Sequence, residues 1–337
     1  MFIFAKTIQM PKIGNIILPE FPLLLAPMED VSDPPFRRLC KLHGADLMYS
    51  EFISSEGLIR DAIKSRKKLD IFDYERPVGI QIFGGDEEAM AMSAKIVETV
   101  QPDLVDINFG CPVKKVVCKG AGAGVLKDID LMVRLTKAVI RSTNLPVTVK
   151  TRLGWDESSI NIDEVAERLQ DIGVQALSIH ARTRAQMYKG HSDWSHIARV
   201  KNNQRITMPI FGNGDIDSPI KAKAYKEKYG IDGIMIGRAA IGYPWIFNEI
   251  KHYFKTGEIL EEPTIAQRVE AARNHLIWSI EWKGERVGVV EMRRHYTNYF
   301  KGVNNFRPFK NKLVTEDNPL VLFDVFKEIE HLDFVNS

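Results

Sequence analysis

The sequence predicts an α/β protein, a (β/α)8 TIM barrel followed by a smaller all-helical domain. Short apolar, β-branched runs recur through the first two thirds of the chain and alternate with stretches of helical periodicity. A buried parallel sheet requires this alternation, and eight units in series favour closure into a barrel. The eight runs are 23–26, 47–49, 78–83, 104–107, 147–149, 176–179, 209–211 and 233–236, and the helical stretches between them include 87–100, 130–141, 162–171 and 220–228.

The alternation of strands and helices stops near Trp245, and this change sets the predicted domain boundary. Residues 1–248 are assigned to the barrel, with a short hairpin at 13–16 below it, and residues 249–337 to the helical domain. The 337 residues exceed the roughly 250 of a typical barrel, which leaves room for this second unit. Glycine and proline interrupt its predicted helices at Gly257, Pro263, Gly302, Pro308 and Pro319.

Composition excludes several classes of protein. With 45% hydrophobic and 27% charged residues, the chain is close to the average soluble globular protein. It has no run of about eighteen apolar residues, so we expect neither a membrane span nor secretion, but a cytoplasmic protein. We also expect a monomer. Cys40, Cys111 and Cys118 form no CxxC pair, which argues against a disulfide framework and a zinc site. No metal is therefore expected.

The competing architecture is the doubly wound dinucleotide fold. It requires a Gly-x-Gly-x-x-Gly turn after the first strand, and the sequence has none there. The glycine-rich run at 120–124 has a different spacing and no strand ahead of it. We therefore interpret this run as a mobile loop over the top of the barrel.

Polar residues with donor capacity stand at nearly every predicted strand end, which is where barrels of this type carry their chemistry. The loops after the last two strands commonly bind phosphate, since glycines leave backbone amides free to approach an anion and Arg238 adds a positive charge. The alternative is that these glycines only permit tight turns. The strand-end residues include Pro27, Met28, Gln81, Asn108, Cys111, Lys150, His180, Arg182, Arg184, Asn213, Gly214, Asp215, Gly237 and Arg238.

Seven short motifs stand at or next to these strand ends: APM at 26–28, QIFG at 81–84, DINFGCP at 106–112, VKTRLGW at 149–155, HARTR at 180–184, NGDI at 213–216 and IGRAAIGYPWIF at 236–247. In these motifs the chain resembles the dihydrouridine synthases, and most of all their bacterial B-type subgroup. The resemblance spans residues 22–300, and DINFGCP is its most diagnostic element. Glu29-Asp30 departs from the family, which usually has small residues after APM.

The resemblance implies a tRNA-dihydrouridine synthase that uses FMN, with NADPH or NADH as reductant, to reduce the C5=C6 bond of a uridine. The hydride would reach C6 from reduced flavin, and Cys111 would donate the proton to C5. A thiol with a pKa of about 8.5 is mostly protonated at neutral pH and can serve as this acid. FMN would be held by Pro27, Met28, Glu29, Gln81, Lys150, His180, Asn213, Gly214, Asp215, Gly237 and Arg238, and the substrate by Asn108, Arg182 and Arg184.

Cys111 has a structural alternative as well. A lone cysteine at a strand end is more often a small buried hydrophobe than a catalytic group. The flanking Asn108, Gly110 and Pro112 favour the catalytic interpretation, whereas Cys40 and Cys118 are expected to be structural.

Residues 283–312 suggest an RNA-binding segment. They hold eight basic residues against Glu285 and Glu291, and five aromatic residues lie among them. Phosphate contact and base stacking would suit this composition, and Arg293 and Arg294 are the candidate tRNA contacts. A solvated helix face with core aromatics would have the same composition. Lys114, Lys115 and Lys119 add positive charge beside Cys111.

Two other functions are compatible with parts of this pattern. A small-molecule FMN oxidoreductase of the dihydroorotate dehydrogenase kind would explain the strand-end loops but not the basic segment. A non-catalytic RNA-binding protein on a flavin-enzyme scaffold is disfavoured, because Gln81, Cys111 and Lys150 are all present.

Overall fold

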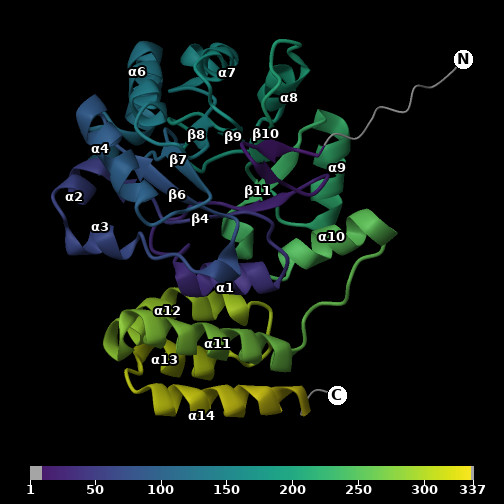
Figure 1. The fold of residues 1–337 in the computed structure, drawn as a ribbon. Helices are drawn as coiled ribbons and strands as arrows, with labels where there is room; N and C mark the ends of the chain where they lie inside the picture. Colours follow the sequence, from purple (N-terminus) through teal and green to yellow (C-terminus); the bar gives the residue numbers. More distant parts are fainter. Residues whose placement is uncertain (1–9, 335–337) are drawn as a thin grey trace, which may run out of the picture.

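A barrel of parallel strands, with a helical bundle beside it, accounts for residues 10–334, which are the residues that this computed structural model describes (Figure 1). Each of the eight predicted apolar runs forms a strand, and every pairing around the barrel is parallel. The predicted (β/α)8 barrel with C-terminal helices is therefore confirmed. The strands are β3 (Leu23–Leu25), β4 (Met48–Tyr49), β6 (Val78–Phe83), β7 (Leu104–Asn108), β8 (Val147–Arg152), β9 (Leu177–His180), β10 (Ile210–Asn213) and β11 (Gly233–Ile236).

The barrel closes between its first two strands. The hydrogen-bonded order is β3-β11-β10-β9-β8-β7-β6-β4, and a short extra strand, β5 (Ile53–Ser54), pairs with the end of β6. Between β3 and β4 there is one bridge, Leu24 to Leu47, and the N–H of Leu25 donates to the carbonyl of Leu47 at 2.9 Å. The Asp46 N–H donates to the carbonyl of Leu23, whose own N–H donates to the Asp46 carboxylate. Closure thus depends on few hydrogen bonds.

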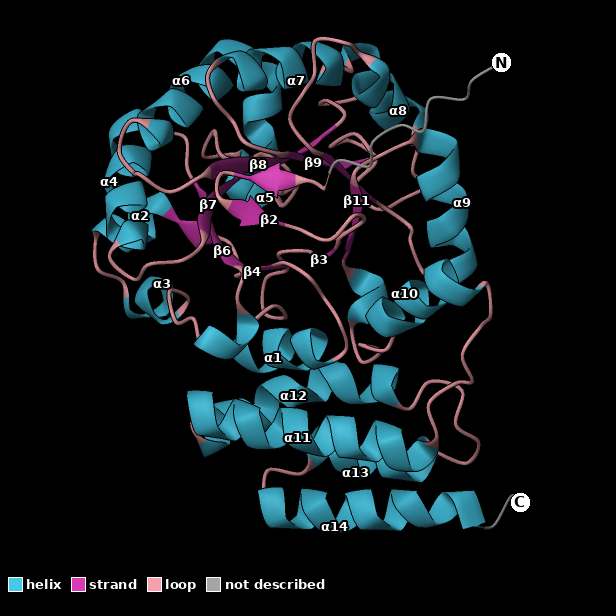
Figure 2. Ribbon diagram, turned by 45° about the vertical axis from the view of Figure 1, so that its right-hand side comes forward, coloured by secondary structure: helices cyan, strands magenta, loops and turns pink. Residues whose placement is uncertain are grey.

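Helices ring the outside of the barrel (Figure 2), and their buried apolar residues share one core with the strands. Strands β7 and β8 are buried along their whole length because helices cover one face and the barrel interior the other. Side-chain caps begin several of the helices, as Asp86 does for α4 and Asp128 for α6. The outer helices are α1 (Pro34–Leu42), α2 (Ser55–Ile59), α3 (Ile63–Lys67), α4 (Glu87–Glu98), α6 (Ile129–Ile140), α7 (Ile162–Asp171), α8 (Ser195–Asn202), α9 (Pro219–Tyr229) and α10 (Ile246–Thr256).

The predicted hairpin at 13–16 is present as β1 (Lys12–Ile13) and β2 (Ile16–Ile17). Gly14 has a φ of +56°, and a Cβ there would lie 2.4 Å from the ring of Pro146, just before β8 begins. Ile13 is fully buried in an apolar cluster with residues such as Leu24 and Leu104. The hairpin therefore closes the bottom of the barrel.

The glycine-rich run differs from the prediction. Gly122–Lys127 form a 3-10 helix, η2, instead of a loop, and its Ala123 and Val125 are buried. Gly122 has a φ of +54°, and a Cβ there would lie 3.0 Å from the carbonyl oxygen of Cys111. Glycine is thus required for close packing against the chain that carries Cys111, a tertiary cause that spacing alone does not reveal.

Within the described residues, four helices form the C-terminal bundle: α11 (Ile265–Lys283), α12 (Glu285–Tyr299), α13 (Arg307–Thr315) and α14 (Pro319–Glu330), ending in the 3-10 turn η5 (His331–Phe334). They share an apolar cluster of their own, which includes Leu276, Met292 and Phe326. Helix α10 crosses the predicted domain boundary at residue 248, and its Phe247 and Ile250 belong to the barrel core.

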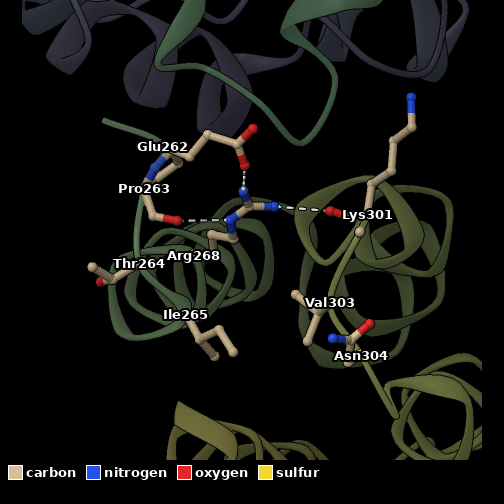
Figure 3. Close-up of a pocket in the computed structure, with 9 residues that line it drawn as sticks. Glu262, Pro263, Thr264, Ile265, Arg268, Lys301, Val303 and Asn304 are labelled. Carbon is tan, nitrogen blue, oxygen red and sulfur yellow. Dashed lines mark hydrogen bonds and ion pairs between the residues drawn. The ribbon is translucent and has the colours of Figure 1, made fainter. Parts of the chain in front are cut away.

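A small cavity of about 300 Å³ lies in the bundle, between the start of α11 and the chain that follows α12 (Figure 3). The Arg268 guanidinium crosses it and donates to the carbonyls of Pro263, Tyr299 and Lys301, and it also pairs with Glu262 at 3.0 Å. All of its nitrogens are thereby satisfied. Arg268 therefore joins α11 to the C-terminal end of α12.

Helix α1 lies between the barrel and the bundle in both views (Figures 1 and 2). Phe36 of α1 packs 5.7 Å from the ring of His275 in α11 and 5.7 Å from that of His295 in α12. Asp33, which caps the start of α1, forms an ion pair with Lys283 that is almost fully buried. Lys283 also pairs with Glu291 at 2.6 Å. A buried ion pair thus fastens the bundle to the barrel.

We predict that Lys283→Met lowers the free energy of unfolding by about 3–5 kcal/mol, because it leaves the buried Asp33 carboxylate without its cation. Chemical denaturation followed by circular dichroism measures this loss. The matched control is Lys312→Met, whose partner Glu328 is exposed and whose loss should cost less than about 1 kcal/mol. Equal effects of the two changes would contradict the role of Lys283.

Candidate functional site

A cavity of about 670 Å³ opens at the carboxyl ends of the strands. Such a volume is within the range of small-molecule and cofactor sites. Residues from β7, β8, β9, β10 and β11 and from the loop after β3 meet there, so the barrel brings most of the predicted site together. The predicted residues that line it are Pro27, Met28, Glu29, Asn108, Cys111, Lys150, His180, Asn213, Gly214, Asp215, Gly237 and Arg238.

Strand β8 supplies two cations to this cavity, Lys150 and Arg152. They are two residues apart, and therefore point to the same side of the strand. Burial, followed by the charge of Arg152, lowers the pKa of Lys150 to about 8. Lys150 makes no side-chain hydrogen bond or ion pair with any described residue. Its ammonium group is free to meet an anionic or hydrogen-bond-accepting ligand.

Arg152 is a site residue that the sequence prediction omitted. Its side chain is only 2% exposed, and its Nε donates to the carbonyl of Gly110 at 2.7 Å. Its Nη1 donates to the carbonyls of Thr183 and Met187. Arg152 therefore joins the Cys111 loop to the loop after β9. The signal for it was its position two residues beyond Lys150 in the same strand.

The turn that carries Cys111 is held from within by Asn108. The Oδ1 atom of Asn108 accepts hydrogen bonds from the N–H of Gly110 at 2.9 Å and from the N–H of Cys111 at 2.8 Å. The Cys111 carbonyl accepts from the N–H of Ala123 in η2. Three separate contacts fix this turn.

The Cys111 thiol lies at the cavity wall and is 6% exposed. Burial raises its pKa above the usual value, and the hydrogen bond from the Val113 backbone and the nearby charge of Arg152 only partly offset that effect. The thiol is therefore protonated at neutral pH, as a proton donor must be. Cys40 is also buried, inside α1, whereas Cys118 is exposed.

One end of the cavity is suited to an anion. Asp215 accepts from Arg182 at 2.6 Å and pairs with Arg238 at 3.3 Å. Gly214 has a φ of +128°, so a side chain there would be strained, and a Cβ would lie 3.0 Å from Ser192. The Arg238 side chain is 58% exposed, which leaves its guanidinium able to bind a second anion.

His180 is neutral in this environment. Burial, followed by the charges of Arg152 and Lys150, lowers its pKa well below the usual value. A neutral imidazole both donates and accepts a hydrogen bond. His180 can therefore contact a polar ligand but does not add to the positive charge of the site.

Three of the predicted strand-end residues do not line the cavity. Gln81 is fully buried beneath it and is bonded to Asn108 and Asp106. Arg182 is 2% exposed, and it bonds to the carbonyls of Lys189 and Gly190 as well as to Asp215. Arg184 lies 4.5 Å from the ring of Trp155. Arg182 thus supports the anion end rather than facing a substrate.

Glu29 and Asp30, the departure from the family pattern, form an acidic group with Glu51 beside the cavity. Lys68 pairs with Glu29 at 2.5 Å and lies 3.5 Å from Glu51. Asp30 has a φ of +58°, and its N–H donates to Glu51 at 2.7 Å. These contacts anchor the loop after β3.

The predicted RNA segment divides into buried and exposed parts. Four of its five aromatic residues are buried in the bundle core: Tyr296, Tyr299, Phe300 and Phe306. RNA bases cannot stack on buried rings, so the predicted stacking role is wrong for these four, and they are core aromatics instead. Phe309 is partly buried and packs against the same cluster. Aromatic residues at helical spacing have the same sequence pattern whether they form part of a core or an exposed stacking surface.

The basic residues of that segment also divide. Arg293 bonds to the carbonyls of Thr315 and Glu316 and to Asp317, and Arg294 pairs with Asp30 at 3.4 Å. Four other cations are exposed and make no ion pair with any described residue; they are Arg286, Lys301, Arg307 and Lys310. Lys114, Lys115 and Lys119, beside the cavity, are exposed and unpaired in the same way.

Comparison with known proteins identifies the family. The model of the dihydrouridine synthase (Dus) family matches residues 24–324. The chain belongs to the dihydrouridine synthase family. The predicted resemblance is thereby confirmed, and family membership makes the chain an enzyme, an oxidoreductase.

Individual relatives match over almost the whole chain. A probable tRNA-dihydrouridine synthase from Rickettsia conorii is 39% identical over 320 residues, which are 95% of this chain and 96% of the relative. The tRNA-dihydrouridine synthase B of Pseudomonas aeruginosa is 40% identical over 309 residues, 91% and 92% of the two chains. The predicted likeness to the B-type subgroup agrees with this match.

Solved structures share the fold. A mutant of morphinone reductase in complex with tetrahydroNAD matches with a TM-score of 0.55 at 12% identity, over 77% of this chain and 93% of that one. A 2-naphthoyl-CoA reductase matches with a TM-score of 0.56 at 13% identity, over 73% of this chain and 52% of its own length. Within residues 10–334, no helix is long and apolar enough to span a bilayer.

We predict that a thiol-alkylating reagent at pH 7.5 modifies Cys118 well before Cys111, because Cys118 is exposed whereas Cys111 is buried and has a raised pKa. Peptide mapping by mass spectrometry follows each site over time. In Cys118→Ser, modification of Cys111 should remain slow. Rapid alkylation of Cys111 would instead mean that its thiol is ionised, which is incompatible with a proton donor.

Proposed function

We propose that this chain is a tRNA-dihydrouridine synthase that binds FMN, takes electrons from NADPH or NADH, and reduces the C5=C6 bond of a uridine. One observation carries the proposal: the buried Cys111 thiol, whose pKa is raised by burial, shares one cavity with a Lys150 side chain that has no partner among the described residues. An acid and a fixed positive charge beside one cavity suit reduction of a ring conjugated to a carbonyl.

The residues present fit FMN. Asp215 holds Arg238 at the anion end, where Gly214, in a backbone conformation that other residues rarely adopt, would let a phosphate approach the backbone amides. Lys150 and His180 offer hydrogen-bond donors deeper in the cavity. When bound, FMN would supply the hydride that uracil C6 requires. The choice of FMN over FAD follows from the single anion end seen among the described residues.

The chain itself would supply the proton and the positioning. Cys111 would protonate C5, and Asn108 and Arg152 hold the turn that carries it. The apolar part of the cavity wall, with Met28, Phe52 and Ile241, would limit access of water to the ring. Because a uridine in folded RNA is stacked, it must be extruded into the cavity, which costs a few kcal/mol.

Exposed cations beside the cavity and on the bundle suit the RNA backbone. Lys114, Lys115 and Lys119 lie beside the cavity in and after α5 (Lys114–Val117), and the four unpaired cations of residues 283–312 lie on the bundle. The small-molecule alternative gives these cations no role. Since Arg293 and Arg294 already have partners, we assign phosphate contact first to Lys301, Arg307 and Lys310.

Arg238→Ala should weaken FMN binding by about 1.5 to 3 kcal/mol, because a charged hydrogen bond to the phosphate is lost. Titration of the apoprotein with FMN, followed by flavin fluorescence, measures the change. The exposed Lys95→Ala, on α4, serves as the control and should bind FMN normally. Release of FAD rather than FMN from purified protein, or an unchanged affinity in Arg238→Ala, would exclude the proposed site.

Cys111→Ala should retain FMN and accept electrons from NADPH, yet reduce uridine about 10² to 10⁴ times more slowly, since one positioned acid is missing. Cys118→Ala is the control and should be unaffected. Single-turnover mixing of reduced enzyme with tRNA measures the step. Because the pKa of Cys111 is raised and that of Lys150 is about 8, the wild-type rate should stay level through neutral pH and begin to fall near pH 8, where Lys150 loses its charge before the thiol ionises. A rate of uridine reduction that already decreases below pH 7 as the pH is raised would refute the assignment of Cys111 as the proton donor.

Replacing Lys301, Arg307 and Lys310 by alanine should weaken tRNA binding and reduce its salt dependence by roughly two to three units of slope, because three counterion-releasing contacts are removed. Arg293→Ala should instead lower the melting temperature and leave the slope nearly unchanged. Affinity measured at several salt concentrations, together with thermal melts, separates the two. A reduced salt slope in Arg293→Ala, with an unchanged slope in the triple variant, would instead support phosphate contact by Arg293 and Arg294.

A further inference from the structure

A buried chain of hydrogen bonds runs from the middle of β7 to the backbone of Cys111. It begins at Asp106, whose Oδ1 accepts from the hydroxyl of Thr148 at 2.5 Å and whose Oδ2 accepts from the Nε2 of Gln81. The Oε1 of Gln81 accepts from the Nδ2 of Asn108 at 2.7 Å. Asn108 then holds Cys111 as described above. All four of these side chains are at most 5% exposed.

In each of these hydrogen bonds, the donor and the acceptor are fixed. An ionised carboxylate only accepts hydrogen bonds, so Gln81 must turn its amino group toward Asp106 and its carbonyl toward Asn108. Asn108 must then turn its own amino group toward Gln81. Its carbonyl oxygen is left to face the two N–H groups of Gly110 and Cys111, which is the arrangement that the turn needs.

We propose that Asp106 is a positioning residue for the Cys111 proton donor: it fixes the direction of the Gln81 and Asn108 amides, and through them the turn that presents the thiol. With the amides reversed, the amino group of Asn108 would meet two N–H donors, and the turn would lose both of its hydrogen bonds.

The ionisation of Asp106 agrees with this role. Burial raises the pKa of its carboxyl to about 6, while the hydrogen bonds from Thr148 and Gln81 hold it from rising further. The carboxylate is therefore mostly ionised at neutral pH and acts only as an acceptor. A core position with no role beyond packing is normally apolar, since a buried charge is costly.

The test rests on the proposed function, because it follows uridine reduction. Asp106→Leu is made both in the wild-type background and in Cys111→Ala. With Cys111 present, we expect uridine reduction in single turnovers to slow by at least roughly tenfold, while FMN content and flavin reduction by NADPH stay near normal. In Cys111→Ala, which lacks the thiol to be positioned, the same change should alter the rate less than about twofold.

A second set of variants keeps the size of each side chain, so that folding does not decide the outcome. In Asp106→Asn, the Thr148 hydroxyl can accept from the new amino group, which leaves the new carbonyl for Gln81 and preserves the direction of the chain. Thr148→Val alone keeps the carboxyl group but raises its pKa, because the hydrogen bond from Thr148 is lost, so its rate is measured at a pH at which the carboxylate stays ionised. Each single variant should lose less than roughly threefold in rate, and the double variant more than roughly tenfold, since nothing then orients the amide introduced at position 106.

The results separate the two proposals. Full uridine reduction by Cys111→Ala would overturn the proposed function itself. An equal effect of Asp106→Leu in both backgrounds, an equal loss of the NADPH step, or additive effects of Asp106→Asn and Thr148→Val would overturn only the positioning role of Asp106.

Discussion

The cost of burying charged groups at the strand ends governs the arrangement of the site. Lys150, Arg152, His180 and Arg182 lie close together and are almost fully buried, and buried charges must find partners or change their pKa. Arg152 and Arg182 bind backbone carbonyls of the loops, which orders those loops, and His180 loses its charge. Of these four, Lys150 alone has no partner among the described residues, so the same constraint that builds the scaffold also leaves one cation for the ligand.

A similar constraint joins the barrel to the bundle. Arg37 of α1 forms a buried pair with Glu75, and Asp33 at the start of the same helix pairs with Lys283 of α11. Both pairs are desolvated, so neither partner can leave without exposing an uncompensated charge to a dry interior. The loop after β3, which lines the cavity through Met28 and Glu29, leads directly into this helix. The position of the bundle is therefore linked to the edge of the site.

Much of this could be predicted from the sequence, because the period of the apolar residues and the polar strand ends are local signals. The eight strands, and cavity residues such as Cys111 and Lys150, follow from them. Other features depend on neighbours distant in the sequence. Gly122 is explained by the Cys111 carbonyl against it, and Arg152 by the Gly110 carbonyl that it binds. Tyr296 and Phe300 had the right spacing for either a core or a stacking surface, and only the packing of α14 against them decides.

The sparse pairing between β3 and β4, where the barrel closes, has a consequence for biosynthesis. On one side β3 pairs with β11, from the far end of the barrel sequence, and on the other it is joined to β4 by a single bridge. During synthesis, the apolar segment Leu23–Leu25 therefore emerges from the ribosome long before its main partner strand, Gly233–Ile236, has been made. A nascent chain in this state exposes an unpaired apolar edge, the kind of surface that chaperones bind and that aggregates when synthesis outpaces folding.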